Sequence, residues 1–176
     1  DTTSGSTFSH VVQKKGVEDD RYSVDKLVED TEWLGYKQVI LKSDNEPAIV
    51  QVLKETLRAL KVNIVDQAME EHPAPYDSKA NGAAERAVRS WAGQLRTIRH
   101  HVERRMKTSI PKDSAMMTWL VSWAADVIFR YKVHSTGRAS HEWITGHRCN
   151  QPVAGFAEKI HFKFTTDKNH RHKMNS

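Results

Sequence analysis

The chain has 176 residues, of which 38% are hydrophobic and 28% charged, a composition typical of a soluble globular domain that can bury a core. Its single cysteine, Cys149, excludes an internal disulfide and a cysteine-rich zinc site. The most apolar stretch, residues 115–129, contains Asp126 and is too short to cross a bilayer. No amino-terminal segment has the order of a signal peptide, so we expect neither secretion nor a membrane partner.

Opposite charges are concentrated in different parts of the chain. The formal net charge is +5 and the pI is near 9.3, which permits an anionic partner without requiring one. Residues 18–32 are rich in acid, whereas residues 86–107 carry basic side chains against Glu103 alone: Arg86, Arg89, Arg96, Arg99, Arg104, Arg105 and Lys107. The positive charge therefore lies mainly on one element and on the tail, where Lys168, Arg171 and Lys173 follow.

Hydrophobic periodicity predicts alternating strands and helices in the first half of the chain. The expected elements are a strand over residues 6–14, a helix over 24–34, a strand over 37–42, a helix over 47–60 and a short strand over 62–65. Ser23 is the expected cap of the first helix and Gly35 its end. Residues 67–80 lack periodicity and contain Pro73 and Pro75, which predicts a mobile loop. This order is typical of an α/β domain.

The second half of the chain is expected to be helical. Residues 81–105 predict a long helix with an apolar stripe beside a face that carries Glu85, Arg89, Arg96 and Arg99. Residues 113–131 predict a second helix, apolar around most of its circumference, whose Met and Trp side chains we assign to the core or to a subunit contact. A short helix and a loop follow.

Two acidic residues occupy positions that suit either structure or chemistry. Asp44 follows the strand expected over 37–42, where α/β sheets commonly hold ligands, but Asp and Asn before Pro47 also suit a helix cap. Glu85 starts the row of arginines, but a solvated Glu85–Arg89 pair explains it as well. Taken singly, both residues favour the structural interpretation, and a metal site requires them together.

The two acidic segments together resemble the catalytic core of retroelement integrases. These are retroviral and copia-type polynucleotidyl transferases with a ribonuclease-H-like fold. The matching residues are L-K-S-D-N-E-P-A-I at 41–49 and P-Y-x-x-x-x-N-G-x-x-E-R at 75–86. The stretch G-R-A-S-H-E-W-I-T-G-H-R at 137–148 is similar to the segment that follows the core in copia-type polyproteins. Together the matching segments cover most of residues 1–163.

The resemblance implies a metal-dependent reaction at phosphodiester bonds of DNA. In the family, three carboxylates hold two divalent cations, Mg²⁺ or Mn²⁺, and Asp44 and Glu85 match the second and the third of them. Two such ions can activate the attacking oxygen and stabilise the leaving oxygen. The residues expected to bind nucleic acid are Arg89, Arg96 and Arg99 on the helix and Tyr76, Lys79 and Asn81 in the loop.

The resemblance also implies that the chain acts as a homo-oligomer on DNA. Trp119 and Trp123 are candidate contacts between copies, although burial in the core explains them equally. We expect an intracellular location, which in a eukaryotic host is the nucleus.

One part of the family pattern has no match. The first family carboxylate lies on a strand that precedes the segment matching residues 1–12, with another strand between them. We therefore expect a ribonuclease-H-like mixed sheet with flanking helices that lacks its first two strands, followed by carboxyl-terminal helices. The expected units are a truncated core at 1–110, a helical extension at 111–162 and a disordered basic tail at 163–176. Residues 39–41 should then have an open strand edge.

Three interpretations follow, in order of preference. The first is an integrase-core fragment that is inactive alone because the first catalytic Asp is missing. The second is a non-catalytic remnant that still binds nucleic acid. The third is an unrelated α/β interaction domain with a solvated basic helix. Metal dependence separates the first two, and the dependence of affinity on salt separates the second from the third.

Overall fold

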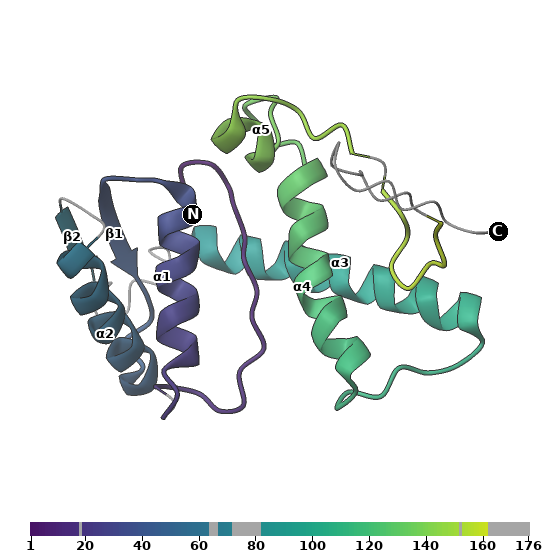
Figure 1. The fold of residues 1–176 in the computed structure, drawn as a ribbon, viewed down its shortest axis with the longest axis horizontal. Helices are drawn as coiled ribbons and strands as arrows, with labels where there is room; N and C mark the ends of the chain where they lie inside the picture. Colours follow the sequence, from purple (N-terminus) through teal and green to yellow (C-terminus); the bar gives the residue numbers. More distant parts are fainter. Residues whose placement is uncertain (18, 64–66, 72–81, 152, 162–176) are drawn as a thin grey trace, which may run out of the picture.

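The structure is a computed structural model that describes residues 1–17, 19–63, 67–71, 82–151 and 153–161 (Figure 1). Its elements are, in chain order, α1 (Tyr22–Leu34), β1 (Gln38–Lys42), α2 (Pro47–Asn63), β2 (Gln67–Glu71), α3 (Gly82–Met106), α4 (Ala115–Tyr131) and α5 (Ser140–Thr145). The fold is mixed α/β, as the alternation in the sequence predicted. The loop residues 72–81 and the expected tail lie outside the described residues.

β1 and β2 form a parallel pair in which Ile40 lies opposite Met69. These two side chains are 58% and 57% exposed, because the other face of the pair is the one that packs on α1 and α2. The core beneath the strands consists of Val28, Val39, Leu41, Leu57, Leu60 and Ala68. Within the described ranges no third strand joins the pair. Two strands alone have marginal stability, so packing against the helices holds them.

The strand predicted over residues 6–14 is wrong. This segment is extended but belongs to no strand, and Figure 1 shows it running between α1 and α4. Side chains hold it in place: Phe8 packs against Trp33 and Phe129, and Ser9 Oγ donates to the Val121 carbonyl at 2.9 Å. A segment with strand composition becomes a strand only when another strand offers its backbone groups, and none lies beside it in the described part of the chain.

The position predicted for the second strand is also wrong. Residues 62 and 63 continue α2, and β2 begins at Gln67, inside the segment predicted to be a loop. The sequence Q-A-M-E-E does not show the alternation of inward apolar and outward polar residues that predicts a strand. Ala68 and Glu70 face inward, while the more apolar Met69 faces outward. A short apolar run such as residues 62–65 fits a helix end as well as a strand.

The predicted Ser23 cap of the first helix does not form. Arg21 occupies the cap position with φ 58°, and no side chain caps the helix there. Ser23 Oγ instead donates to the Gly16 carbonyl at 3.1 Å. Gly35 ends the helix as predicted, since its φ of 71° is a left-handed conformation that glycine adopts without a steric penalty.

α4 crosses α3, and their contact contains the second core cluster (Figure 1). Val102, Ile110 and Leu120 are its fully enclosed side chains. Ser114 caps α4 by accepting the Met117 N–H at 3.3 Å. The helix is not buried all round, however: Trp119 is 73% exposed, so a place in the core does not explain this tryptophan.

Candidate functional site

Asp44 lies two residues after the last residue of β1, with its side chain exposed. Pro47 begins α2, and the first helical backbone bond runs from the Val50 N–H to the Glu46 carbonyl at 2.9 Å. Lys15 Nζ pairs with Glu46 at 2.5 Å and so ties this loop to the amino-terminal segment. The structure therefore places the Asp44 carboxylate at the carboxyl end of a strand, on the surface.

Glu85 lies in the first turn of α3 and is also exposed. A carboxylate is favourable there because the partial positive charge of a helix start attracts it. Among the residues that the structure describes, Glu85 takes part in no ion pair, and the Glu85–Arg89 pair of the solvated-face interpretation is not formed. Its oxygens are therefore accessible to a ligand.

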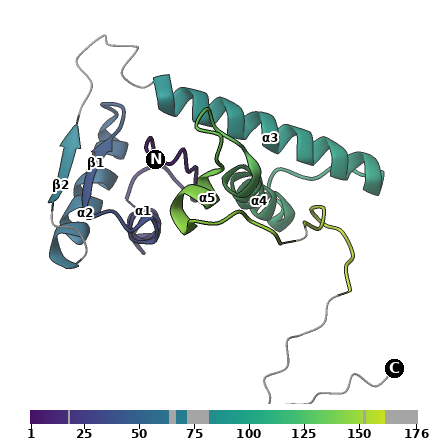
Figure 2. The ribbon, with the colours of Figure 1, turned by 90° about the horizontal axis from the view of Figure 1, so that it is seen from above.

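The two carboxylates belong to elements that approach the same edge of the sheet. β1 and β2 are parallel and therefore end at one edge, and Figure 2 shows α3 beginning on the side toward which β2 points. Three predicted DNA contacts, Tyr76, Lys79 and Asn81, lie outside the described residues. In the described ranges no group of three His, Cys, Asp or Glu side chains is placed to hold a metal ion. Asp44 and Glu85 thus present two exposed carboxylates.

The exposed side of α3 is a basic ridge. Arg89 and Arg96 are both exposed on it, and they stand about 10 Å apart along the axis at 1.5 Å per residue. Other exposed basic or titratable side chains of this helix and its end are Arg86, His100, His101, Arg104, Arg105 and Lys107. Such a ridge can hold phosphates of a nucleic acid backbone without reading its sequence.

Arg99, the third predicted phosphate ligand, has a different setting. Its side chain is 31% exposed, and it donates from Nε to Glu103 Oε1 and from Nη2 to the Ile110 carbonyl, both at 2.9 Å. Glu103 Oε1 also accepts the Ile110 N–H at 2.9 Å. We call these three residues, Arg99, Glu103 and Ile110, the clasp, because they fasten the end of α3 to the turn before α4.

The clasp changes the protonation of its carboxylate. The pKa of Glu103 is lowered from its ordinary value of 4.5, chiefly by the Ile110 N–H and next by the Arg99 guanidinium. The spacing of Arg99 and Glu103 could have indicated their pairing in the sequence. The sequence could not have indicated the contribution of Ile110, because that contact depends on the turn that follows the helix.

A second feature was missed in the sequence because its residues come from distant segments. Phe8, Trp33, Phe129 and His141 form a continuous group of ring contacts beside a cavity of about 860 Å³. No local spacing brings these rings together, and the cavity is described below.

No protein-family model and no curated protein matches this chain. Among the described helices, none combines the length and the apolar character that crossing a bilayer requires.

Proposed function

We propose that this chain is part of an integrase-like catalytic core with a ribonuclease-H-like fold, which processes and joins DNA ends by metal-dependent phosphodiester transfer. The main support is the placement of two carboxylates: Asp44 is exposed at the carboxyl end of β1, and Glu85 is exposed in the first turn of α3. Strand ends in open α/β sheets commonly hold ligands. The motifs at 41–49 and 75–86 resemble those of the family at these same two positions.

The donor set fits a hard divalent cation in part. Asp44 and Glu85 offer exposed carboxylate oxygens, which suit Mg²⁺ or Mn²⁺, and Mg²⁺ is commonly bound by one or two carboxylates together with substrate phosphates. When bound, the two ions of the family site would activate the attacking oxygen and stabilise the leaving oxygen. No carboxylate in residues 1–176 matches the first position of the family triad, so we propose that these residues alone do not catalyse joining.

We further propose that Arg89 and Arg96 position DNA by binding its phosphates, and that Arg99 supports them by fastening the end of α3. A fluorescein-labelled duplex and anisotropy at rising KCl concentration test this. Each phosphate contact should add about 0.9 to the slope of log affinity against log salt. Arg58 on α2 provides the control, since its side chain is 75% exposed and its removal deletes an equal charge elsewhere.

The second candidate, a non-catalytic module that binds nucleic acid, is favoured by the absence of a three-ligand group in the described residues. It predicts the same salt dependence but no effect of Mg²⁺ or Mn²⁺ that depends on Asp44 and Glu85. The third candidate, an unrelated α/β interaction domain, predicts weak binding to the duplex with no contribution from Arg89 or Arg96.

We also propose that α4 contributes to self-association. Trp119 is 73% exposed beside a hollow of about 320 Å³ formed with Ser122, Trp123, Asp126 and Phe156. Exposed aromatic surface next to an apolar hollow is a common feature of protein interfaces.

A further inference from the structure

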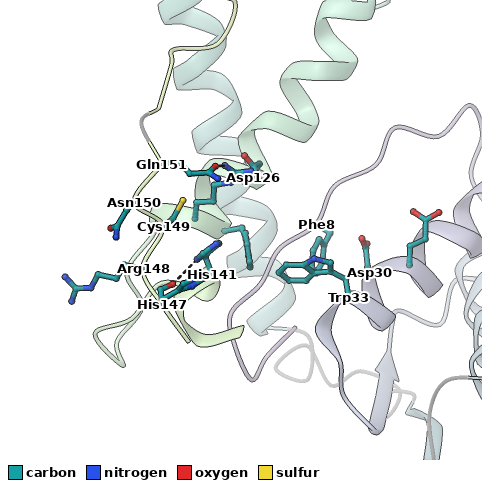
Figure 3. A pocket seen from close by; sticks show the side chains of 13 residues that line it. Phe8, Asp30, Trp33, Asp126, His141, His147, Arg148, Cys149, Asn150 and Gln151 are labelled. Carbon is teal, nitrogen blue, oxygen red and sulfur yellow. Dashed lines mark hydrogen bonds and ion pairs between the residues drawn. The ribbon is translucent and has the colours of Figure 1, made fainter. Parts of the chain in front are cut away.

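A cavity of about 860 Å³ lies between α1 and the segment that follows α5 (Figure 3). One wall comes from α1 and the amino-terminal segment, with Phe8, Glu29, Asp30 and Trp33. The opposite wall comes from the end of α4 and residues 147–151. In Figure 2, α1 and α5 lie below α3 and to one side of α4, and no residue of α3 lines the cavity. Its occupant need not be nucleic acid.

Aromatic rings form the apolar part of the cavity. Phe8, Trp33 and Phe129 touch one another, with ring centroids 5.9, 6.4 and 5.1 Å apart, so they form a packed wall without a gap between them. Trp33 is nevertheless 48% exposed, which leaves ring surface open toward the cavity. A ligand can therefore lie on this wall but cannot enter it.

Acidic side chains stand beside the exposed ring. Glu29 and Asp30 precede Trp33 by four and three residues and so lie one helical turn away. Figure 3 shows Asp30 and Trp33 on the same wall. Glu29 is 58% exposed and pairs with Lys26 at 2.5 Å, and Asp30 is 18% exposed and contacts His10 at 2.8 Å. The rest of α1 adds Asp25 and Glu32.

The basic residues of the opposite wall are neutralised by acids of their own. Arg130 Nε lies 2.9 Å from Asp126, and Arg148 Nε lies 3.4 Å from Glu142. The acids of α1 are paired as well, Glu29 with Lys26 and Asp30 with His10, but α1 carries four carboxylates against Lys26 alone. The α1 wall therefore keeps a surplus of negative charge and attracts a cation. A phosphate or carboxylate ligand would meet Glu29 and Asp30 and is disfavoured.

We propose that this cavity binds an arginine or lysine side chain from an extended segment of a partner protein. The cation would lie on the exposed face of Trp33, which binds cations better than other aromatic side chains do, with its charged head toward Glu29 and Asp30. Arginine is the better fit, because its planar guanidinium stacks on a ring and donates to carboxylates together. Apolar neighbours in the segment would cover Phe8, which is half-buried. This site goes beyond the proposed action on DNA and does not depend on it.

The experiment follows the indole N–H signal of Trp33 by NMR, with the signal assigned from its loss in Trp33→Phe. The probes are acetyl-Leu-Arg-Leu-amide and its partner acetyl-Leu-Glu-Leu-amide, each titrated to about 10 mM, since a short peptide is expected to bind in the millimolar range. We expect the arginine peptide to shift the Trp33 signal with saturation and the glutamate peptide to leave it in place. Trp119 and Trp143, which lie outside the cavity, serve as internal controls.

Variants test the acidic residues separately from the fold. Glu29→Gln should weaken binding of the arginine peptide several-fold, and Glu29→Gln with Asp30→Asn about tenfold. Glu32→Gln, an exposed change on α1 outside the cavity lining, should leave the affinity unchanged. Because Glu29 is exposed, the single variant is expected to fold even if the double variant does not. No shift of the Trp33 signal by the arginine peptide, or equal shifts by both peptides, would overturn the proposal; the second result would indicate a purely apolar peptide site.

Discussion

Arg99 Nε donates to Glu103 Oε1 at 2.9 Å, one turn apart at the end of α3. The same carboxylate oxygen accepts the Ile110 N–H, and the Arg99 guanidinium reaches the Ile110 carbonyl. Arg99, predicted from the sequence to bind phosphate, therefore holds the turn before α4 in the structure. The predicted phosphate contact and the observed structural contact have different consequences when Arg99 is changed, and this difference can be measured.

The contribution of the clasp to the stability of the protein should depend on pH. The pKa of Glu103 is lowered in the folded protein, so its contribution is present above the ordinary value of 4.5 and is lost as pH falls through the lowered folded pKa. Urea unfolding of the wild type and of Glu103→Gln should therefore differ at pH 7, and the difference should shrink as the pH falls below 4.5. A difference that does not change with pH would show that Glu103 acts through packing.

Substitutions of Arg96 and Arg99 should distinguish an effect on DNA affinity from an effect on stability. Arg96 is exposed, so Arg96→Ala should reduce DNA affinity for every sequence alike, flatten the salt slope by about one unit and change stability by less than about 0.5 kcal/mol. Arg99→Ala should lower the urea midpoint as well, because Glu103 and Ile110 lose a donor. A loss of affinity confined to one DNA sequence would contradict a phosphate contact.

Gly5 is constrained by both conformation and space. Its φ is +73°, and an added Cβ would collide with the His134 ring. Gly5→Ala should therefore destabilise the protein by more than about 1 kcal/mol. Gly137→Ala is the matched control, since Gly137 has φ +78° with open space around it, and should show the conformational cost alone. Equal losses in thermal unfolding would mean that the amino-terminal turn does not pack on His134.

His134 should make stability depend on pH in a higher range. Burial, and next Lys132, lowers the pKa of His134 from its ordinary value of 6.5. The ring lies 2.9 Å from Ser140 Oγ, a fully buried hydroxyl. The unfolded chain then binds a proton more readily, so stability is complete above pH 6.5 and falls as pH drops below it toward the folded pKa. In urea unfolding, His134→Gln should remove the loss of stability between pH 7 and 5. The separate loss of stability that Glu103 causes at lower pH should remain.

Trp119 should contribute to self-association but not to the stability of the folded monomer. Because 73% of it is exposed, Trp119→Gln should change monomer stability by less than about 0.5 kcal/mol while shifting sedimentation profiles toward the monomer. Trp143→Gln on α5, where the ring is 42% exposed, is the control with an equal loss of tryptophan. An unchanged assembly in Trp119→Gln would exclude this face.

Local signals in the sequence predicted most helices but not their partners. Pro47 and Gly35 mark a helix start and a helix end, and the apolar period of α3 is long enough to be unambiguous. The strand at residues 6–14 was wrong because strand formation needs a neighbour that composition does not specify. β2 was missed because Met69, its most apolar large residue, faces outward.

The residues of the candidate site also differ in whether the sequence could predict them. Asp44 and Glu85 were predicted from motifs, and in the structure both are exposed, Asp44 two residues after β1 and Glu85 in the first turn of α3. The clasp and the aromatic wall depend on contacts between segments that lie far apart in the chain, such as Phe8 with Phe129. Such contacts carry no local period that a sequence could display.

The most direct test of the proposed function is whether Asp44 and Glu85 bind one cation together. Mn²⁺ binding would be measured by electron paramagnetic resonance for the wild type, Asp44→Asn, Glu85→Gln and the double variant. Glu46→Gln is the control, because Glu46 lies beside Asp44 but pairs with Lys15. If both are ligands of one ion, each single change should reduce affinity at least about tenfold, and the double change little further. Independent losses that add in the double variant, or unchanged Mn²⁺ binding in all variants, would contradict a shared metal site.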